Sequence, residues 1–587
     1  MRPVRIANCS GFYGDRLAAA REMVDGGPID VLTGDYLAEL TMLILWKARE
    51  KDPGAGFART FLTQLEEVLG TCLDRGIKII SNAGGLNPAG LAAQIGELAA
   101  RLGLVPRVAY VHGDDLLPRL PDLLRGGVDL AHLDTGRPLA GAGVQPVSAN
   151  AYLGGWGIAE ALGAGADVVV TGRVTDASLV VGPAAWWHGW SHTDWDALAG
   201  AVAAGHVIEC GPQACGGNYA FLSEVTDRRY PGFPIAEVAA DGSSVITKHA
   251  DTGGLVSVGT VTAQLLYEID TPSYANPDVV ADFGTIELTP DGPDRVLLTG
   301  TRGSPPSDQL KVALNHLGGY RNTMTLVLTG LELEEKAAWA EQELFGILGG
   351  RDGFAETDVQ LLRFDTPDAP SNARATAHLR ITVKDTDRRK VGRRFSDATM
   401  QLALGGYAGC HTTTPPSAES AYGVYWPALV PRKRVEHVVV LPDGTSRVVP
   451  HPPCDRTGPA QAREAHRPPP GNRVDTTERV PLGRVVGARS GDKGGNANVG
   501  LWARDDETWE WLAATMTVER FRELLPEAEG LVVRRYELPR LRALNLVVVG
   551  LLGEGVASAA RPDPQAKGLG EYLRSRTLAV PVRLLGP

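Results

Sequence analysis

The chain has 587 residues, of which 43% are hydrophobic and 22% charged, and its formal net charge at pH 7 is -11. A single hydrophobic core stops growing at about 250–300 residues, so this length predicts two or three domains. The composition is ordinary for a soluble globular protein. The negative charge argues against a nucleic-acid partner, because a nucleic-acid-binding surface is basic.

The cysteine pattern and the N-terminus point to a reduced compartment. The six cysteines are scattered and form no Cys-x-x-Cys pair, which argues against a zinc ribbon or a thioredoxin-like redox pair. No apolar run of signal-peptide length follows Met1, and no uninterrupted apolar stretch reaches about 18 residues. We therefore expect a cytoplasmic protein without a membrane span. We also expect a homo-oligomer, because closed assemblies of one chain are common among soluble proteins.

Up to about residue 210 the chain alternates short apolar runs with helical patterns, which is typical of βαβ units. This alternation predicts an α/β fold: a doubly wound, mostly parallel sheet forms the core, and a smaller α+β domain follows at the C-terminus. The predicted strands are residues 5–9, 30–33, 77–81, 105–111 and 166–170. The predicted helices are residues 16–24, 37–49, 57–73 and 89–102, with a further helix opening near Asp176.

A loop rich in glycine and polar residues follows each of these predicted strands. The loops are residues 10–15, 34–36, 82–87, 113–115 and 172–176. In open α/β sheets, ligands bind beyond the carboxyl ends of the strands, so we expect these loops to share one edge. Taken singly, each loop is better explained as a plain turn between strand and helix, and only the set of loops together favours a ligand site. The ligand-binding candidates in this half are Gly11, Gly84, Gly85 and Asn87.

The rest of the chain divides into a continuation of the core, a linker and a second domain. Residues 295–434 alternate strand and helix patterns, so they are assigned to the core domain, 1–448. Seven prolines between Pro450 and Pro470 predict a semi-rigid linker, 449–475. The C-terminal domain is then 476–587, with interleaved strand and helix patterns that suit a small α+β sandwich.

Residues Ala488–Asn498 combine three glycines with an acid, two basic residues and two asparagines between apolar runs. Glycine inside a helix or strand costs roughly 0.5–1 kcal/mol relative to alanine, so the pattern predicts a loop. A lysine among free backbone N–H groups makes an anion cradle. The ligand-binding candidates here are Ser490, Gly491, Asp492, Lys493, Gly494 and Asn496. The alternative is a tight hairpin whose Asp492 and Lys493 face water.

Several familiar site motifs are absent. Residues 154–159 lack the G-x-G-x-x-G spacing of a dinucleotide site, and the glycine spacing before Lys493 does not match Walker A. There is no Gly-x-Ser-x-Gly elbow. No His-Glu-x-x-His or His-x-His motif indicates a catalytic zinc. The sequence thus identifies no cofactor and no metal ligand.

The acid/base candidates are aspartates that directly follow apolar runs. Asp35, Asp134 and Asp176 adjoin glycine, threonine or arginine, and an edge of a sheet supplies the environment that tunes a carboxyl pKa. Asp176 is equally placed to cap a helix. Arg173 is a candidate for holding a carboxylate or phosphate bidentately, and a surface salt bridge is the alternative. His112 and His249 are interpreted as structural, and the aromatic residues 186–190 as packing at a domain or subunit interface.

Several motifs resemble the acyclic terpene utilisation (AtuA-like) family. Residues 490–494, 536–539 and 563–567 resemble its C-terminal domain, and residues 11–15, 33–39, 81–88 and 171–176 look like its core domain. The resemblance implies a ferredoxin-like fold for the C-terminal domain and a substrate among branched acyl-CoA thioesters or branched acids. Cys215 stands where the family more often has threonine, which weakens a nucleophilic role. Asp251 likewise replaces a glycine, which puts the ligand contacts of that loop in doubt.

The resemblance leaves three functional hypotheses. The first is an enzyme in which Asp35, Asn82, Arg173 and Asp176 do acid/base and oxyanion work on an acyl-CoA thioester, in a hydration or carbon–carbon lyase step. In it the 490–495 loop binds the anionic end of CoA or completes the site. The second is a non-catalytic subunit or scaffold beside acyl-CoA carboxylase subunits of the biotin-dependent type. The third is a metal-dependent hydrolase that uses the clustered aspartates.

Overall fold

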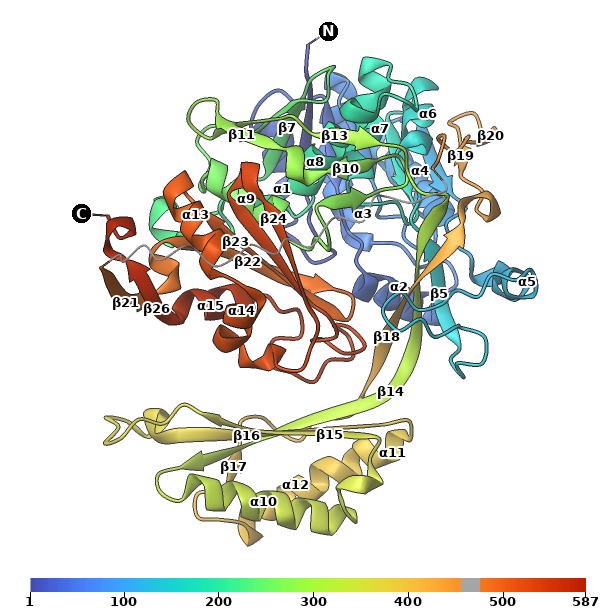
Figure 1. Cartoon of the computed structure of the whole chain (residues 1–587). Coiled ribbons are helices and arrows are strands. Elements are labelled where there is room, and N and C mark those ends of the chain that lie inside the picture. Colours follow the sequence, from blue (N-terminus) through green and yellow to red (C-terminus); the bar gives the residue numbers. More distant parts are fainter. Residues whose placement is uncertain (1, 456–475, 587) are drawn as a thin grey trace. The chain divides into compact units, whose positions relative to one another are not determined.

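The computed structural model describes residues 2–455 and 476–586 (Figure 1). The chain divides into two compact units. The first comprises Met1–Asn315, Tyr425–Val556 and Asp563–Pro587, and the second comprises His316–Val424 and Ala557–Pro562. Most of the second unit thus comes from a region that the sequence pattern assigns to the core domain. Residues 456–475 of the predicted linker lie outside the described residues.

Five parallel strands form the centre of the main sheet in the first unit. They are β1 (Val4–Asn8), β2 (Val31–Gly34), β3 (Lys78–Ser81), β6 (Val168–Thr171) and β4 (Val108–His112), in this spatial order. Their bounds lie within a few residues of the predicted strands. Because parallel strands end at the same edge, the loops that follow them share that edge.

Antiparallel strands extend this sheet on both sides. Beyond β1 lie β7 (Pro234–Val238), β8 (Ser244–Lys248), β12 (Arg295–Thr299) and β11 (Glu287–Pro290), and beyond β4 lie β19 (Val438–Val440) and β20 (Ser446–Val448). The sheet is therefore mixed, whereas the sequence predicts a mostly parallel one. The physical reason is loop length: only five residues join β7 to β8, and a parallel crossover needs a dozen or more.

Helices pack on both faces of the main sheet. One face carries α1 (Ala19–Asp25), α3 (Arg59–Arg75) and α4 (Pro88–Leu102), and the other carries α6 (Trp156–Gly163), α7 (Ser178–His188) and α8 (Trp195–Ile208). Alternate strand residues enter the two cores, as Ile79 and Ile80 of β3 do. Helix α3 is amphipathic, with Phe61, Leu65 and Val68 buried one turn apart.

Shorter elements complete the core part of the first unit. The remaining helices are α2 (Glu39–Lys51), α5 (Leu120–Arg125) and α9 (Val258–Leu265). Strands β9 (Ser273–Ala275), β10 (Val280–Asp282) and β13 (Arg302–Ser304) make a small separate sheet. Strand β5 (Pro146–Ala151) pairs with β14 (Gln309–Thr329). Strand β14 and strand β18 (Ser420–Pro431) each continue from one unit into the other.

The C-terminal region contributes a four-stranded antiparallel sheet and three helices to the first unit. Its strand order is β22 (Val486–Lys493), β23 (Asn496–Ala503), β25 (Ala543–Val548) and β24 (Val533–Leu538). The helices are α13 (Asp506–Thr515), α14 (Val518–Leu524) and α15 (Leu569–Ser575). Strands β21 (Thr477–Pro481) and β26 (Thr577–Pro581) form a separate pair.

The predicted 490–495 loop is instead the end of a strand and a tight turn, which is the hairpin that the sequence analysis gives as the alternative. Strand β22 pairs with β23 from Val486 opposite Ala503 to Lys493 opposite Asn496, and Gly494, with φ at +65°, reverses the chain. The loop prediction is wrong because it rests on the rule that glycine interrupts strands. Glycine inside a strand also marks a place where another group approaches closely. A Cβ on Gly491 would lie 2.4 Å from a ring carbon of Tyr267.

The second unit is a sheet covered on one face by helices (Figure 1). Its strand order is β15 (Glu356–Arg363), β16 (Thr376–Asp385), β14 and β17 (His411–Thr412). Helices α10 (Leu333–Leu348) and α12 (Arg393–Gly405) pack their apolar sides on the sheet, and the short helix α11 (Arg388–Val391) precedes α12.

The longest helices in the described ranges, α10 and α3, are 16 and 17 residues long and have a polar as well as an apolar side. Across residues 2–455 and 476–586, no helix has the length and apolar character needed to cross a lipid bilayer.

Candidate active site

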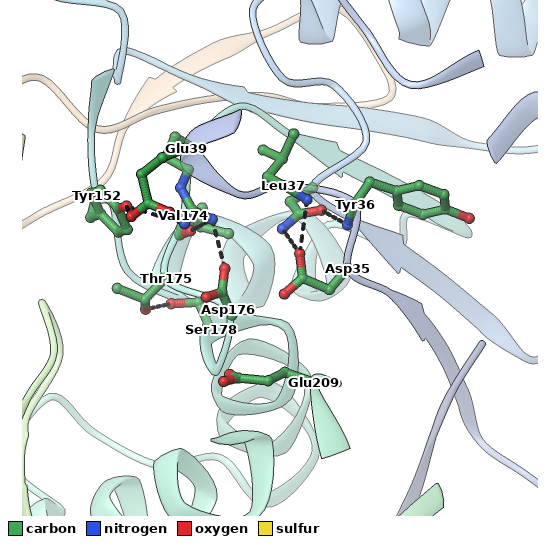
Figure 2. A network of polar contacts seen from close by, with 12 residues as sticks. Asp35, Tyr36, Leu37, Glu39, Tyr152, Val174, Thr175, Asp176, Ser178 and Glu209 are labelled. Carbon is green, nitrogen blue, oxygen red and sulfur yellow. Dashed lines mark hydrogen bonds and ion pairs between the residues drawn. The ribbon is translucent and has the colours of Figure 1, made fainter. Parts of the chain in front are cut away.

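Three carboxylates from different elements face one another at the carboxyl edge of the parallel strands. Asp35 directly follows β2, Asp176 lies in the loop after β6, and Glu209 follows the last residue of α8. Figure 2 shows the three side chains turned toward the same space. Burial, followed by the charge of Asp176, raises the pKa of both Asp35 and Glu209 well above its ordinary value. These two groups therefore hold protons to a higher pH than exposed carboxyls do.

Asn82 fixes the orientation of Asp35. Its Nδ2 donates to Oδ1 of Asp35 at 2.6 Å, and its Oδ1 accepts a 2.8 Å hydrogen bond from the backbone N–H of Tyr36. The backbone N–H of Leu37 also donates to Oδ1 of Asp35, at 3.1 Å. Asp35 is 4% exposed and Asn82 is fully buried. The carboxyl is thus held rigidly, with its second oxygen free of these bonds.

Arg173 is buried, and its guanidinium donates hydrogen bonds to both Asp176 and Tyr152. Its Nη1 donates to Oδ1 of Asp176 at 2.6 Å, and its Nη2 donates to the Tyr152 hydroxyl at 3.2 Å (Figure 2). The guanidinium carbon lies 4.3 Å from the centre of the Tyr152 ring. Since Arg173 is 3% exposed, the surface salt bridge considered from the sequence is wrong.

Asp176 does not cap helix α7. The N-cap position is Ala177, which makes no side-chain capping bond, and the hydroxyls of Thr175 and Ser178 lie 2.6 Å apart there. The Asp176 carboxylate instead accepts from Arg173. The alternative interpretation of Asp176 as a helix cap is therefore not the arrangement observed.

The Asp114 carboxylate accepts a hydrogen bond from the backbone of Arg173. Its Oδ2 accepts from the Arg173 N–H at 2.9 Å and from Nδ2 of Asn150 at 2.8 Å. Burial raises the pKa of Asp114 to about 7, against the opposing effect of these bonds. Gly172 is required beside it, because a Cβ there would lie 2.3 Å from Oδ1 of Asp114.

A second group of charged and phenolic side chains adjoins Arg173. The Tyr152 hydroxyl donates to Oε1 of Glu39 at 3.2 Å (Figure 2). Nζ of Lys311 lies 4.9 Å from the Tyr152 ring centre and 5.6 Å from that of Tyr425. Burial opposes ionisation of Glu39, but Lys311 and then Arg173 outweigh it and lower the pKa of Glu39. Glu39 is thus an ionised neighbour of a buried cation pair.

The tip of the β22–β23 hairpin lies against these core groups rather than facing water. Burial, then the charges of Glu268 and Glu39, raise the pKa of Asp492 to about 8. Nζ of Lys493 lies 5.6 Å from the ring centre of Tyr274. Burial and then Lys493 lower the pKa of His206 to about 4, so this imidazole is neutral at pH 7. The C-terminal region therefore brings one carboxyl group and one amine side chain to the carboxylate site.

Buried amides fasten the hairpin to the core. Nδ2 of Asn498 donates to the Leu266 carbonyl at 2.7 Å and to Oδ1 of Asn545 at 2.9 Å, while Oδ1 of Asn498 accepts from the Glu268 N–H at 2.9 Å. Nδ2 of Asn545 in turn donates to the Asp270 carbonyl at 3.0 Å. Since unpaired buried amides are costly, this network fixes the hairpin at one position on the core.

The predicted ligand-binding residues of the core make structural contacts. A Cβ on Gly11 would lie 2.7 Å from the Cys210 carbonyl carbon, and one on Gly84 would lie 2.4 Å from the Thr171 oxygen. Gly85 has φ at +50°. Asn87 caps α4, its Oδ1 accepting from the Gly90 N–H at 2.9 Å. These contacts shape the loops around Asn82, and a ligand role for the four residues stays a prediction.

The hairpin candidates divide into two sets. Asp492 and Lys493 lie at the carboxylate site, and Gly491 packs beside them on Tyr267. Ser490 points elsewhere, since its Oγ accepts from the Gly570 N–H at 2.9 Å. Gly494 makes the turn. Asn496 donates from Nδ2 to Oδ1 of Asp134 at 2.9 Å.

Other residues considered from the sequence have structural partners. Burial raises the pKa of the Cys215 thiol, which disfavours the thiolate that a nucleophile needs. His249 contacts the Met23 carbonyl through Nε2 at 2.9 Å. Trp187 and Trp190 donate from Nε1 to the carbonyls of Arg2 and Ala240. Within the described ranges, no group of three or more His, Cys, Asp or Glu side chains is arranged to hold a metal ion.

Sequence reasoning missed Glu39, Tyr152, Glu209, Lys311 and Tyr425. Glu39 falls inside the predicted helix 37–49, and Glu209 belongs to no predicted element. The other three lie in or beside strands without a motif. Glu209 had one usable signal, an acid directly before a Cys-Gly-Pro break. The others became visible only when the strands were placed.

Comparison with family models covers most of the chain. Residues 4–441 match the acyclic terpene utilisation family protein AtuA, and residues 480–579 match the AtuA ferredoxin-like domain. Comparisons with curated proteins and with solved structures found no match. Membership suggests a role in acyclic terpene utilisation, and the second match identifies the C-terminal region as ferredoxin-like. The residues that carry the carboxylate site come from both matched regions, and the chain belongs to the acyclic terpene utilisation (AtuA) family.

Proposed function

We propose that this protein is a catabolic enzyme that acts on a branched acyl-CoA thioester by acid/base chemistry, in a hydration or carbon–carbon lyase step. The observation that carries the proposal is the convergence of Asp35, Asp176 and Glu209, with the buried Arg173 bonded to Asp176. Neighbouring carboxyls with divided protonation states supply an acid and a base at the same pH. The branched thioester as substrate rests on the family's association with acyclic terpenes.

Either reaction uses the same pair of groups. In hydration, an ionised carboxylate removes a proton from water as the oxygen attacks the β-carbon, and a carboxylic acid protonates the α-carbon. In the lyase step, the base removes the β-hydroxyl proton, the bond between the α- and β-carbons breaks, and the acid protonates the α-carbon. Asp176, paired with Arg173, is the candidate base, and Asp35, with its raised pKa, is the candidate acid.

The cationic side chains around the carboxylates support an anionic or oxyanion-forming substrate. Lys311 and Lys493 reach the site from β14 and β22, and each lies near tyrosine rings. A positive charge placed where a thioester oxygen gains negative charge stabilises the enolate of either reaction. Lys493 is therefore proposed to bind an anionic part of the thioester substrate.

The test combines turnover with ligand-induced stabilisation of the full chain. Branched acyl-CoAs with an α,β-double bond or a β-hydroxyl group are assayed by chromatography for hydration and cleavage, with wild type, Lys493→Ala and the exposed control Lys51→Ala. A ligand at about 100 times its Kd stabilises the fold by about 2.7 kcal/mol, which shifts the melting curve measurably. We expect turnover and stabilisation in wild type and Lys51→Ala, and a loss of both in Lys493→Ala. Binding of protein partners without turnover of any thioester would refute the enzyme.

A further inference from the structure

We propose that Arg489 binds an oxyanion of the substrate. This inference rests on the proposed function and adds a recognition group to it. Arg489 is 5% exposed, its Nη2 donates to Oε1 of Gln213, and its guanidinium carbon lies 4.0 Å from the ring centre of Tyr267. Among the residues that the structure describes, no carboxylate lies within 4.0 Å of its nitrogens, and its buried Nε has no hydrogen-bond partner.

Within the part of the chain that the structure describes, the other arginines whose whole side chains are buried, Arg173, Arg432 and Arg535, have fuller sets of partners. Arg173 pairs with Asp176, and Arg535 pairs with Glu537 at 2.9 Å. Among residues 2–455 and 476–586, Arg432 has no carboxylate within 4.0 Å either, but both its Nε and its Nη2 donate to the Ser307 carbonyl. Burying a charge without a counter-ion is costly. The incomplete set of partners around Arg489 is therefore what a site for an external anion requires.

Arg489 also lies on the side of β22 that reaches the carboxylate site. Side chains at positions 489, 491 and 493 share one face of the strand, and Gly491 there contacts Tyr267 and Glu268 of the core. Lys493, about 13 Å along the strand at 3.3 Å per residue, also has no carboxylate within 4.0 Å among residues 2–455 and 476–586. This face thus presents two cations that the described chain does not neutralise at contact distance.

The position of Arg489 relates the anion site to the reacting groups. Its charge acts on the thiol of Cys210, lowering a pKa that burial and Glu209 raise, and the charge of Asp35 acts on the same thiol. The hydrogen-bond partner of Arg489, Gln213, lies four residues beyond Glu209 in the chain, which relates Arg489 to that end of the carboxylate trio. A guanidinium binds a carboxylate or a phosphate through parallel N–H bonds. The oxyanion comes either from a carboxylate of the acyl part or from a phosphate of CoA.

Isothermal titration of the full chain tests this role with four probes: 3-methylbutanoate, 3-methylbutanoyl-CoA, CoA and inorganic phosphate. The first variant, Arg489→Gln, removes the cation. The second, Gln213→Met, keeps Arg489 but removes the side chain that accepts its hydrogen bond. We expect Arg489→Gln to weaken at least one probe about tenfold or more, because a charge-assisted bond is lost. Gln213→Met should change that affinity less than about threefold. If Arg489→Gln loses affinity for 3-methylbutanoate, the bound oxyanion is a carboxylate. If it loses affinity for CoA and inorganic phosphate, the bound oxyanion is a phosphate.

Three results would overturn the inference: no probe binds wild type, Arg489→Gln binds every probe as wild type does, or both variants lose affinity equally, which indicates a docking role for the residue. The proposed function is judged separately by turnover. If Arg489→Gln keeps both turnover and substrate affinity, the anion site is refuted and the proposed enzyme is not. If a probe binds through Arg489 but no thioester is turned over, the proposed enzyme is refuted and the anion site is not.

Discussion

Asn82 donates a 2.6 Å hydrogen bond to Asp35 from the loop after the neighbouring parallel strand, 47 residues further along the chain. The amide cannot rotate freely, because its oxygen accepts from the Tyr36 N–H. The two side chains therefore form one rigid unit at the end of β2 and β3. A carboxyl that is held in this way is positioned before any substrate arrives.

Replacing Asp35 by asparagine tests its role as the acid. The change keeps the shape of the side chain but removes the proton, so turnover of the branched thioester should fall by about 100-fold or more, the usual contribution of an acid or base. The measurement is kcat/KM in the chromatographic assay. Asp74→Asn, at an exposed position on α3, is the control and should leave kcat/KM unchanged. Equal rates in the two variants would remove Asp35 from the mechanism.

Asp114 predicts a specific dependence of stability on pH. Its pKa is about 7 in the folded protein and near 3.8 when unfolded, so the folded state holds the proton to higher pH. Its contribution is fully present below pH 3.8 and is lost progressively as the pH rises to about 7. The Tm of Asp114→Asn minus that of wild type should rise across this window and stay level above it. A difference independent of pH between 4 and 7 would contradict the raised pKa.

Alanine at position 491 should disturb the seat of the hairpin. The added Cβ would lie 2.4 Å from Tyr267 and 3.0 Å from Cγ of Glu268. Overpacking of this kind costs about 1–3 kcal/mol, and denaturant unfolding monitors the loss. Gly96→Ala is the matched control, because a Cβ there meets nothing within 4 Å in the exposed middle of α4. It should be neutral or stabilising by roughly 0.5–1 kcal/mol.

Replacing Asn498 by leucine should loosen the C-terminal region from the core. The Leu266 carbonyl and the Glu268 N–H would be left without their partner in a buried place. Each unsatisfied group costs about 1–3 kcal/mol, and thermal unfolding followed by calorimetry measures the sum. Gln94→Leu, on the exposed side of α4, serves as control and should change stability by less than about 0.5 kcal/mol. Matching melting curves for the two variants would show that the amide network is not what holds the hairpin.

The sequence by itself determined the local elements and the edge at which the site lies. The periodic apolar residues of α3 and the apolar runs of β1, β2, β3 and β6 predict elements close to those observed. Once these strands are taken as parallel, their following loops must meet at one edge, which brings Asn82 to Asp35 and Arg173 to Asp176. Local patterns suffice here because each motif directly follows its own strand.

Only the tertiary structure decided which charges complete the site. Glu209, Lys311 and Tyr425 reach it from a helix end and two strands far apart in the sequence, and no local pattern records such a meeting. The mixed sheet was likewise decided by short hairpins at its margins, and strand β22 by its pairing with β23. The strand pairing also placed Arg489 against Tyr267 and away from any carboxylate partner in the described chain. Whether a charge is buried or paired depends on neighbours that folding alone brings into contact.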